Sequence, residues 1–207
     1  MSNLAVFISG NGSNLQAIIN RWKKEDTAFD IKLVFCNKDD AYGIRRATKA
    51  GIPVKILLHS DFVDRQAYDQ KIQEIMLAHQ IDLIALAGFM RLLSSWFVEK
   101  WAGKILNIHP SLLPAFPGLN AQKQALEHGV RFSGCSVFFV DSGVDTGAII
   151  SQAVVPIFLN DSLETLSKRI LKKEHLIFPT AINDVALGKV SLCNSKAVFK
   201  IKATQTN

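Results

Sequence analysis

The stretch Leu4-Ala5-Val6-Phe7-Ile8-Ser9-Gly10-Asn11-Gly12-Ser13-Asn14-Leu15 decides the fold. Residues 4–9 form a short apolar run, typical of a buried strand, that ends in Gly-Asn-Gly. Apolar residues then recur at helical spacing, at Leu15, Ile18, Ile19 and Trp22. The stretch therefore predicts a strand, a tight turn and a helix, the repeating unit of an α/β fold.

The same alternation continues along the chain. Further strands are expected over 31–36, 53–58, 81–87 and 104–108, and helices over 41–50, 68–79 and 94–101. Apolar strands alternating with helices predict a Rossmann-like, mostly parallel sheet with helices on both faces. Because ligands of such sheets bind beyond the carboxyl ends of the strands, the site is expected at Gly10–Asn14, Cys36–Asp40, Gly88–Arg91 and His109–Ser111.

The pattern changes after residue 131. Two longer strands are expected over 133–140 and 148–157, joined by residues 141–147, as an antiparallel pair or an excursion at the sheet edge. A long helix should follow, with Asp161 as its N-cap and Glu164 as the capping-box partner. Gly188 is expected to end this helix, and Pro179 to break or kink it.

The composition is that of an ordinary globular protein, with 48% hydrophobic and 20% charged residues. The 207 residues fit one domain, without a membrane span or a signal peptide. Cys36, Cys135 and Cys193 are widely spaced, which argues against a disulfide framework or zinc cage and for a cytoplasmic protein. The net charge of +6, partly from Lys196, Lys200 and Lys202, permits anionic ligands, but no motif supports nucleic-acid binding.

The segment Ser9–Asn14 lies between a strand and a helix. Its small residues allow the backbone to approach an anion, and the helix N-terminus supplies free N–H groups, so a phosphate fits here. The spacing is neither a dinucleotide fingerprint, because Leu15 stands where the last glycine belongs, nor a P-loop. A tight turn with an ordinary serine cap is the alternative.

Asn107 and His109 are two residues apart in an expected strand and therefore face the same side. An amide and an imidazole aimed together at the carboxyl end of the sheet could stabilise an oxyanion. Pro110 ends the strand, and Pro114 is a candidate for a cis bond. An Asn-x-His pair alone would more often be structural, and it is the surrounding prolines and Ser111-Leu112-Leu113 that favour function.

Two carboxylates stand out. Asp145 lies between glycines, where an aspartate is usually a turn residue, but the same flexible backbone could carry it to an imidazole whose charged form it would stabilise. Glu174 shares a helix stripe with Leu166 and Ile170, so it is either a stripe-edge residue that reaches water or a buried group with a partner. The histidines show no metal-ligand spacing, and no metal is expected.

Six segments together resemble phosphoribosylglycinamide formyltransferase, a folate-dependent family of purine synthesis. They are Ile8–Ile18, Ala87–Leu93, Asn107–Pro114, Phe116–Gly118, Asp145–Gly147 and Glu174–His175. The resemblance covers residues 4–190. It implies a formyltransferase-type fold in one domain, 1–207, with an acceptor-phosphate half (1–103), a formyl-folate and catalytic half (104–190) and a basic tail (191–207).

The resemblance also implies roles. Asn11, Gly12, Ser13 and Asn14 would hold the acceptor phosphate, and Glu174 the ribose hydroxyls. Asn107, His109 and Asp145 would be catalytic, transferring the formyl group of 10-formyltetrahydrofolate to the amine of glycinamide ribonucleotide. The folate would bind at Arg65, Met90, Arg91, Leu92, Leu93 and Asn107, and along the backbone of residues 141–145. Only small-molecule partners are implied, with the chain a monomer or homodimer.

Three positions depart from the family pattern, since Phe138, Asn120 and Gln122 stand where histidines are common. Their expected effect is on local hydrogen bonding and pH dependence. Three alternatives share the scaffold: a formyl-folate hydrolase, a methionyl-tRNA formyltransferase and a non-catalytic nucleotide-binding protein. The first two normally carry a further N-terminal or C-terminal domain, and the third is disfavoured by the intact Asn107, His109 and Asp145.

Overall fold

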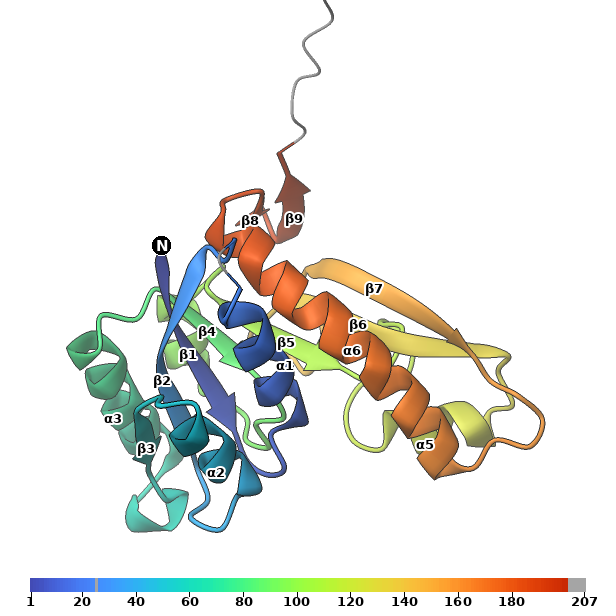
Figure 1. Cartoon of the computed structure of the whole chain (residues 1–207), viewed down its shortest axis with the longest axis horizontal. Coiled ribbons are helices and arrows are strands. Elements are labelled where there is room, and N and C mark those ends of the chain that lie inside the picture. The colour runs from blue at the N-terminus through green and yellow to red at the C-terminus, as the bar shows by residue number, and fades with distance from the viewer. Residues whose placement is uncertain (25, 201–207) are drawn as a thin grey trace, which may run out of the picture.

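The computed structural model describes residues 1–24 and 26–200 (Figure 1). Seven strands form one sheet in the order β3-β2-β1-β4-β5-β6-β7. Their bounds are β1 Ser2–Ile8, β2 Phe29–Cys36, β3 Val54–Ile56, β4 Leu83–Leu86, β5 Ile105–His109, β6 Phe132–Phe139 and β7 Ile149–Pro156. The first five strands pair in parallel, whereas β6 runs antiparallel to both β5 and β7. The expected parallel sheet with an antiparallel edge extension is confirmed.

Helices cover both faces of the sheet. They are α1 Ser13–Trp22, α2 Tyr42–Lys49, α3 Arg65–Ala78, α4 Ser95–Lys100, α5 Ala121–Glu127 and α6 Leu163–Ala186, with a 3₁₀ turn at His59–Asp61. Alternate residues of β1 point into different cores: Val6 packs with residues of α1, α2 and α6, and Phe7 with residues of α3 and α4. This alternation explains why the strand is apolar throughout.

Helix α6 begins one residue later than expected. Its N-cap is Ser162, which forms a capping box with Thr165, so the assignment of Asp161 and Glu164 to these roles is wrong. Asp161 instead binds Arg169 through both carboxylate oxygens. The helix also continues through Pro179, so the expectation of a break there is wrong, while a kink at this residue stays a prediction. In Figure 1 it crosses the sheet beside α1, with which it packs.

The last described residues form a small structure that the sequence did not predict. Strands β8 (Val190–Cys193) and β9 (Lys196–Phe199) make an antiparallel hairpin next to the end of α6 (Figure 1). The expected basic tail is thus partly folded, and Lys202 lies outside the described residues. No helix in the described part of the chain is long and apolar enough to cross a bilayer.

Candidate functional site

The strand order reverses direction at β1, which has β2 on one side and β4 on the other. Ligands of open α/β sheets bind at such a switch point. A cavity of about 200 Å³ lies here, lined by the loop Ser9–Asn14 and by Ala87, Gly88 and Met90. The loop following β1 and the loop following β4 are therefore two walls of one cavity, as the sequence predicted.

The loop after β1 presents the free end of helix α1. Gly12 adopts a left-handed conformation (φ 72°), and no side chain caps the helix there. A Cβ on Gly12 would lie 2.7 Å from the Cα of Gly43, so only glycine allows this approach of the loop to α2. The alternative of an ordinary serine cap is therefore wrong, and the first N–H groups of α1 remain available to an anion.

Arg46 of α2 holds this loop in place. Its guanidinium donates to the backbone oxygen of Asn11 and to the side-chain Oδ1 of Asn11, both at 2.9 Å. These partners are neutral, so the positive charge of Arg46 remains beside the loop. Arg46 could not be predicted from the sequence, because its position in the chain gives no sign that α2 packs against the loop.

Glu174 is buried, with 7% of its surface exposed, and the outward-facing interpretation is wrong. The side-chain N–H of Asn14 donates to Oε2 of Glu174 at 2.7 Å, which joins α1 to α6. Burial raises the pKa of Glu174, and the hydrogen bond from Asn14 opposes that rise. The structure thus brings together two residues, 160 positions apart, to which the family resemblance assigns the acceptor.

Ser9 and Asn37 lie in two of the segments that the sequence placed at the site, and they connect three loops. The Ser9 hydroxyl donates to Oδ1 of Asn37 at 2.6 Å and accepts the backbone N–H of Met90 at 2.8 Å. Both side chains are buried. Each follows an apolar strand directly, so their position at the carboxyl ends of β1 and β2 was the available signal.

His109, the last residue of β5, pairs with Asp145 of the loop between β6 and β7. Nδ1 of His109 lies 3.2 Å from Oδ2 of Asp145, with 7% and 13% of the side chains exposed. Asp145 has a left-handed backbone (φ 54°), and its Oδ2 also accepts the N–H of Gly118 at 2.8 Å. The other ring nitrogen, Nε2, lies 2.9 Å from the carbonyl oxygen of Phe116. The expected pairing is present, with a second contact that the sequence did not indicate.

Asn107 lies on the same strand as His109 and is partly exposed. Its neighbours Leu106 and Ile108 pack in the core shared with α6, so the expected division of faces is observed. None of the hydrogen bonds in the described part of the chain involves the Asn107 side-chain amide, which leaves that amide free for a ligand.

The loop after His109 is held by buried hydroxyls. The Ser136 hydroxyl donates to the carbonyl of Ser111 at 2.7 Å and accepts the N–H of Leu113 at 3.0 Å. The Leu113–Pro114 bond is cis, as the sequence suggested. Ser136 is fully buried on β6 and was not selected from the sequence.

A formyl transferase family model matches residues 2–182 of the chain. The chain belongs to the formyl transferase family. It is 45% identical to phosphoribosylglycinamide formyltransferase of Escherichia coli over 195 residues, 94% of this chain and 92% of that protein. It also resembles the solved glycinamide ribonucleotide transformylase 1 of Symbiobacterium toebii, with a TM-score of 0.94 and 43% identity over 97% of this chain and 95% of that one.

Longer relatives contain the same formyl transferase unit. The trifunctional purine biosynthetic protein adenosine-3 of Drosophila melanogaster is 53% identical over 181 residues, 86% of this chain. The chain spans only 13% of that relative, and 20% of the corresponding human protein.

The residues expected at the folate lie in two places on the formyl transferase. Met90, Arg91, Leu92 and Leu93 follow β4, where the side chains of Met90 and Leu92 are 71% and 55% exposed. Arg91 lies over the ring of Tyr68, 4.6 Å from its centroid. Arg65 is exposed at the first position of α3.

The departures from the family pattern lie in different environments. Phe138 is 2% exposed and pairs directly with Asn107 across β5 and β6, which places an apolar ring where the expected histidine would offer a hydrogen bond. Asn120 has a left-handed backbone (φ 60°) before α5, and Gln122 lies within α5. Phe138 is therefore the departure that faces a candidate catalytic residue across a strand pair. Among the described residues, no three His, Cys, Asp or Glu side chains cluster as metal ligands would.

Proposed function

We propose that this formyl transferase moves the formyl group of 10-formyltetrahydrofolate to the amine of glycinamide ribonucleotide, giving formylglycinamide ribonucleotide and tetrahydrofolate in purine synthesis. The observation that carries the proposal is the pairing of His109 with Asp145 at the end of β5, beside Asn107 and the uncapped loop after β1. Relatives named phosphoribosylglycinamide formyltransferase, 44% and 45% identical, support it.

In the proposed reaction, the acceptor nitrogen attacks the formyl carbon and the formyl oxygen takes up negative charge. Asn107 and the imidazolium of His109 donate hydrogen bonds to that oxygen. The carbon–nitrogen bond to the folate then breaks, and a proton moves from the incoming amine to the departing nitrogen, through water, with the help of Asp145. Because Nε2 of His109 faces the Phe116 carbonyl here, donation to the substrate from that nitrogen requires exchange of this contact.

The two substrates are assigned to different walls of the site. The acceptor phosphate would bind at the backbone N–H groups of Asn11 to Asn14, and the ribose hydroxyls at Glu174, which Asn14 already orients. The folate would bind along Met90–Leu93 and the 141–145 backbone, with Arg65 near its acidic tail.

Steady-state assays separate this function from its alternatives. Purified protein with 10-formyltetrahydrofolate should lose the formyl group only when glycinamide ribonucleotide is present. Loss without the acceptor would indicate a hydrolase, transfer to methionyl-tRNA would indicate that transferase, and no turnover would indicate a nucleotide-binding protein.

The proposal includes the cellular compartment of the reaction and the oligomeric state of the enzyme. We place it in the cytoplasm, with small-molecule partners only and a monomer or homodimer as the working unit. The three cysteines are free thiols, which is consistent with a reducing compartment.

A further inference from the structure

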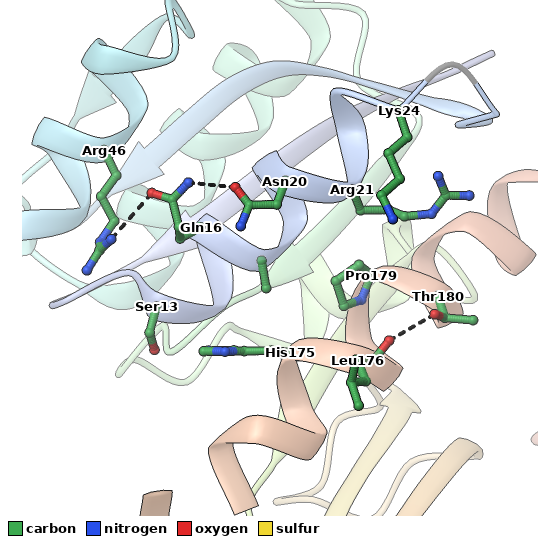
Figure 2. A pocket seen from close by; sticks show the side chains of 11 residues that line it. Ser13, Gln16, Asn20, Arg21, Lys24, Arg46, His175, Leu176, Pro179 and Thr180 are labelled. Atoms are coloured by element: carbon green, nitrogen blue, oxygen red, sulfur yellow. Dashed lines mark hydrogen bonds between the residues drawn. The ribbon is translucent and has the colours of Figure 1, made fainter.

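A second and larger cavity lies outside the proposed reaction site, between α1 and α6 (Figure 2). Its volume is about 440 Å³. Eleven residues line it: Ser13, Gln16, Ala17, Asn20, Arg21, Lys24, Arg46, His175, Leu176, Pro179 and Thr180. Only Ser13 also lines the cavity at the loop after β1, so the two cavities are neighbours that share one wall. We call the larger one the α1–α6 groove.

The charged side chains that line the groove are all positive. Among the residues that the structure describes, its lining contains three permanent cations, Arg21, Lys24 and Arg46, and no carboxylate. Arg21 is paired with Asp26, whose side chain is 78% exposed outside the groove. The groove should therefore attract anions, and the attraction should weaken as salt is added.

The cations lie at two ends of the groove. Arg46 donates to Gln16, and Gln16 donates to Asn20, a chain of side chains that runs along α1 (Figure 2). Arg21 and Lys24 follow at the far end. From position 16 to its end at Trp22, α1 rises roughly 9 Å, and Lys24 lies beyond that end. A ligand with several negative charges spread over its length would match this spacing better than a single phosphate.

His175 adds an unused polar group beside Arg46. Its Nε2 is buried and has no hydrogen-bond partner among the described residues. Burial and the nearby Arg46 lower the pKa of His175, so the imidazole is neutral at pH 7 and can offer one N–H. Buried polar groups are usually satisfied, so this nitrogen has an unmet hydrogen bond beside the groove, which the imidazole can make to a ligand by turning toward it.

We propose that the α1–α6 groove binds an oligophosphate group, either as free polyphosphate or as the phosphate chain of a nucleoside triphosphate. Arg46 and the His175 imidazole would hold one end, and Lys24 and Arg21 the other. Ala17, Leu176 and Pro179 are apolar members of the lining that a nucleoside would contact. This site does not depend on the proposed reaction, because its binding can be measured without turnover.

Isothermal titration of the full chain at low salt tests the proposal with three probes: inorganic tripolyphosphate, ATP and orthophosphate. A saturating concentration of glycinamide ribonucleotide, or of ribose 5-phosphate if the proposed function fails, blocks the loop at Asn11–Asn14. Tripolyphosphate and ATP should still bind, and orthophosphate much more weakly. Tighter binding of ATP would identify a nucleotide as the ligand. Tighter binding of tripolyphosphate would identify free polyphosphate instead.

Matched lysine variants locate the site. Lys24→Gln should weaken tripolyphosphate binding by about twofold to fivefold, the effect of one exposed charge pair, and Lys24→Glu should weaken it further. Lys23→Gln, at the neighbouring exposed lysine outside the groove, should leave binding unchanged. No binding of either oligophosphate, equal effects of the Lys23 and Lys24 substitutions, or complete competition by the loop ligand would overturn the proposal.

Discussion

At His109, both ring nitrogens face acceptors, the Asp145 carboxylate on one side and the Phe116 carbonyl on the other. Only the charged imidazole can donate from both nitrogens at once. The Asp145 carboxylate also receives the Gly118 N–H, so a single side chain orients the ring and the loop beyond it. The chemistry of the site therefore depends on the charge of Asp145 as well as on its position.

We predict that Asp145→Asn keeps the fold but lowers kcat by about 10²- to 10⁴-fold, because an amide cannot stabilise the charged imidazole as a carboxylate does. Asparagine tolerates the left-handed backbone at this position, which protects the fold. Steady-state kinetics and thermal unfolding of the same preparation provide the measurement. A kcat close to that of the unmodified protein would contradict the proposed role of Asp145 in stabilising the charged imidazole of His109.

Glu174→Gln should raise the KM for glycinamide ribonucleotide by roughly tenfold to a few hundredfold, because hydrogen bonds to a charged acceptor contribute about 1.5–3 kcal/mol each. The KM for the folate should barely change. Glu164→Gln, an exposed change on the same helix, is the control. Equal changes in both KM values would reject the ribose role.

The same substitution should change the pH dependence of stability. The pKa of Glu174 is raised from 4.5, so the folded state holds this proton more tightly than the unfolded chain. Its stabilising contribution is complete below the unfolded pKa and is lost as the pH rises through the folded pKa. The free energy of unfolding of Glu174→Gln, relative to the unmodified protein, should therefore increase between pH 4 and pH 7 in urea titrations. A pH-independent difference would contradict this prediction.

At the scale of elements, loops are connected by buried polar groups from neighbouring helices. Asp69 of α3 is fully buried and accepts the backbone N–H of Ser94, the N-cap of α4, at 2.5 Å. Burial raises the pKa of this carboxyl. Since Ser94 ends the segment that contains Met90–Leu93, Asp69 anchors the proposed folate wall.

Asp69→Leu should lower the free energy of unfolding by about 1–3 kcal/mol, because the Ser94 N–H loses its acceptor. It should also raise the KM for the folate while leaving that for the ribonucleotide nearly unchanged. Asp69→Asn retains an acceptor oxygen and should keep most of the stability. Denaturant unfolding and kinetics of both variants test this, and identical behaviour of Leu and Asn would show that the hydrogen bond is unimportant.

At the scale of the whole molecule, hydrogen bonds join α6, near the C-terminus, to the N-terminal part of the chain. The side chain of Asn183, near the end of α6, accepts the backbone N–H of Ala28 immediately before β2, at 2.8 Å. Asn183 is buried, with 7% of its surface exposed. Together with the Asn14–Glu174 contact, this bond fixes α6 on the parallel half of the sheet.

Asn183→Ala should therefore destabilise the protein by about 1–3 kcal/mol, measured by urea unfolding, since the Ala28 N–H would lose its partner. Asp184→Ala is the matched control, because it removes only a solvent-exposed ion pair with Lys189 and should cost about 0–1 kcal/mol. Similar losses in both variants would mean that the Asn183 bond does not tie α6 to the sheet.

The sequence alone determined the features that depend on local periodicity. The apolar run of β1 and the spacing of Leu15, Ile18 and Ile19 predicted a strand and a helix, and their repetition predicted the parallel sheet. The period of two along β5 placed Asn107 and His109 on one face. These patterns are readable because each repeats within a few residues.

The tertiary structure decided which distant groups meet. The contact of Asn14 with Glu174 depends on how α6 packs across α1, and the contact of His109 with Phe116 involves a backbone carbonyl, which every residue possesses. The α1–α6 groove likewise exists only once two helices from opposite ends of the chain lie side by side. Such contacts leave no local pattern, because the free energy that selects them comes from burying the faces of whole elements.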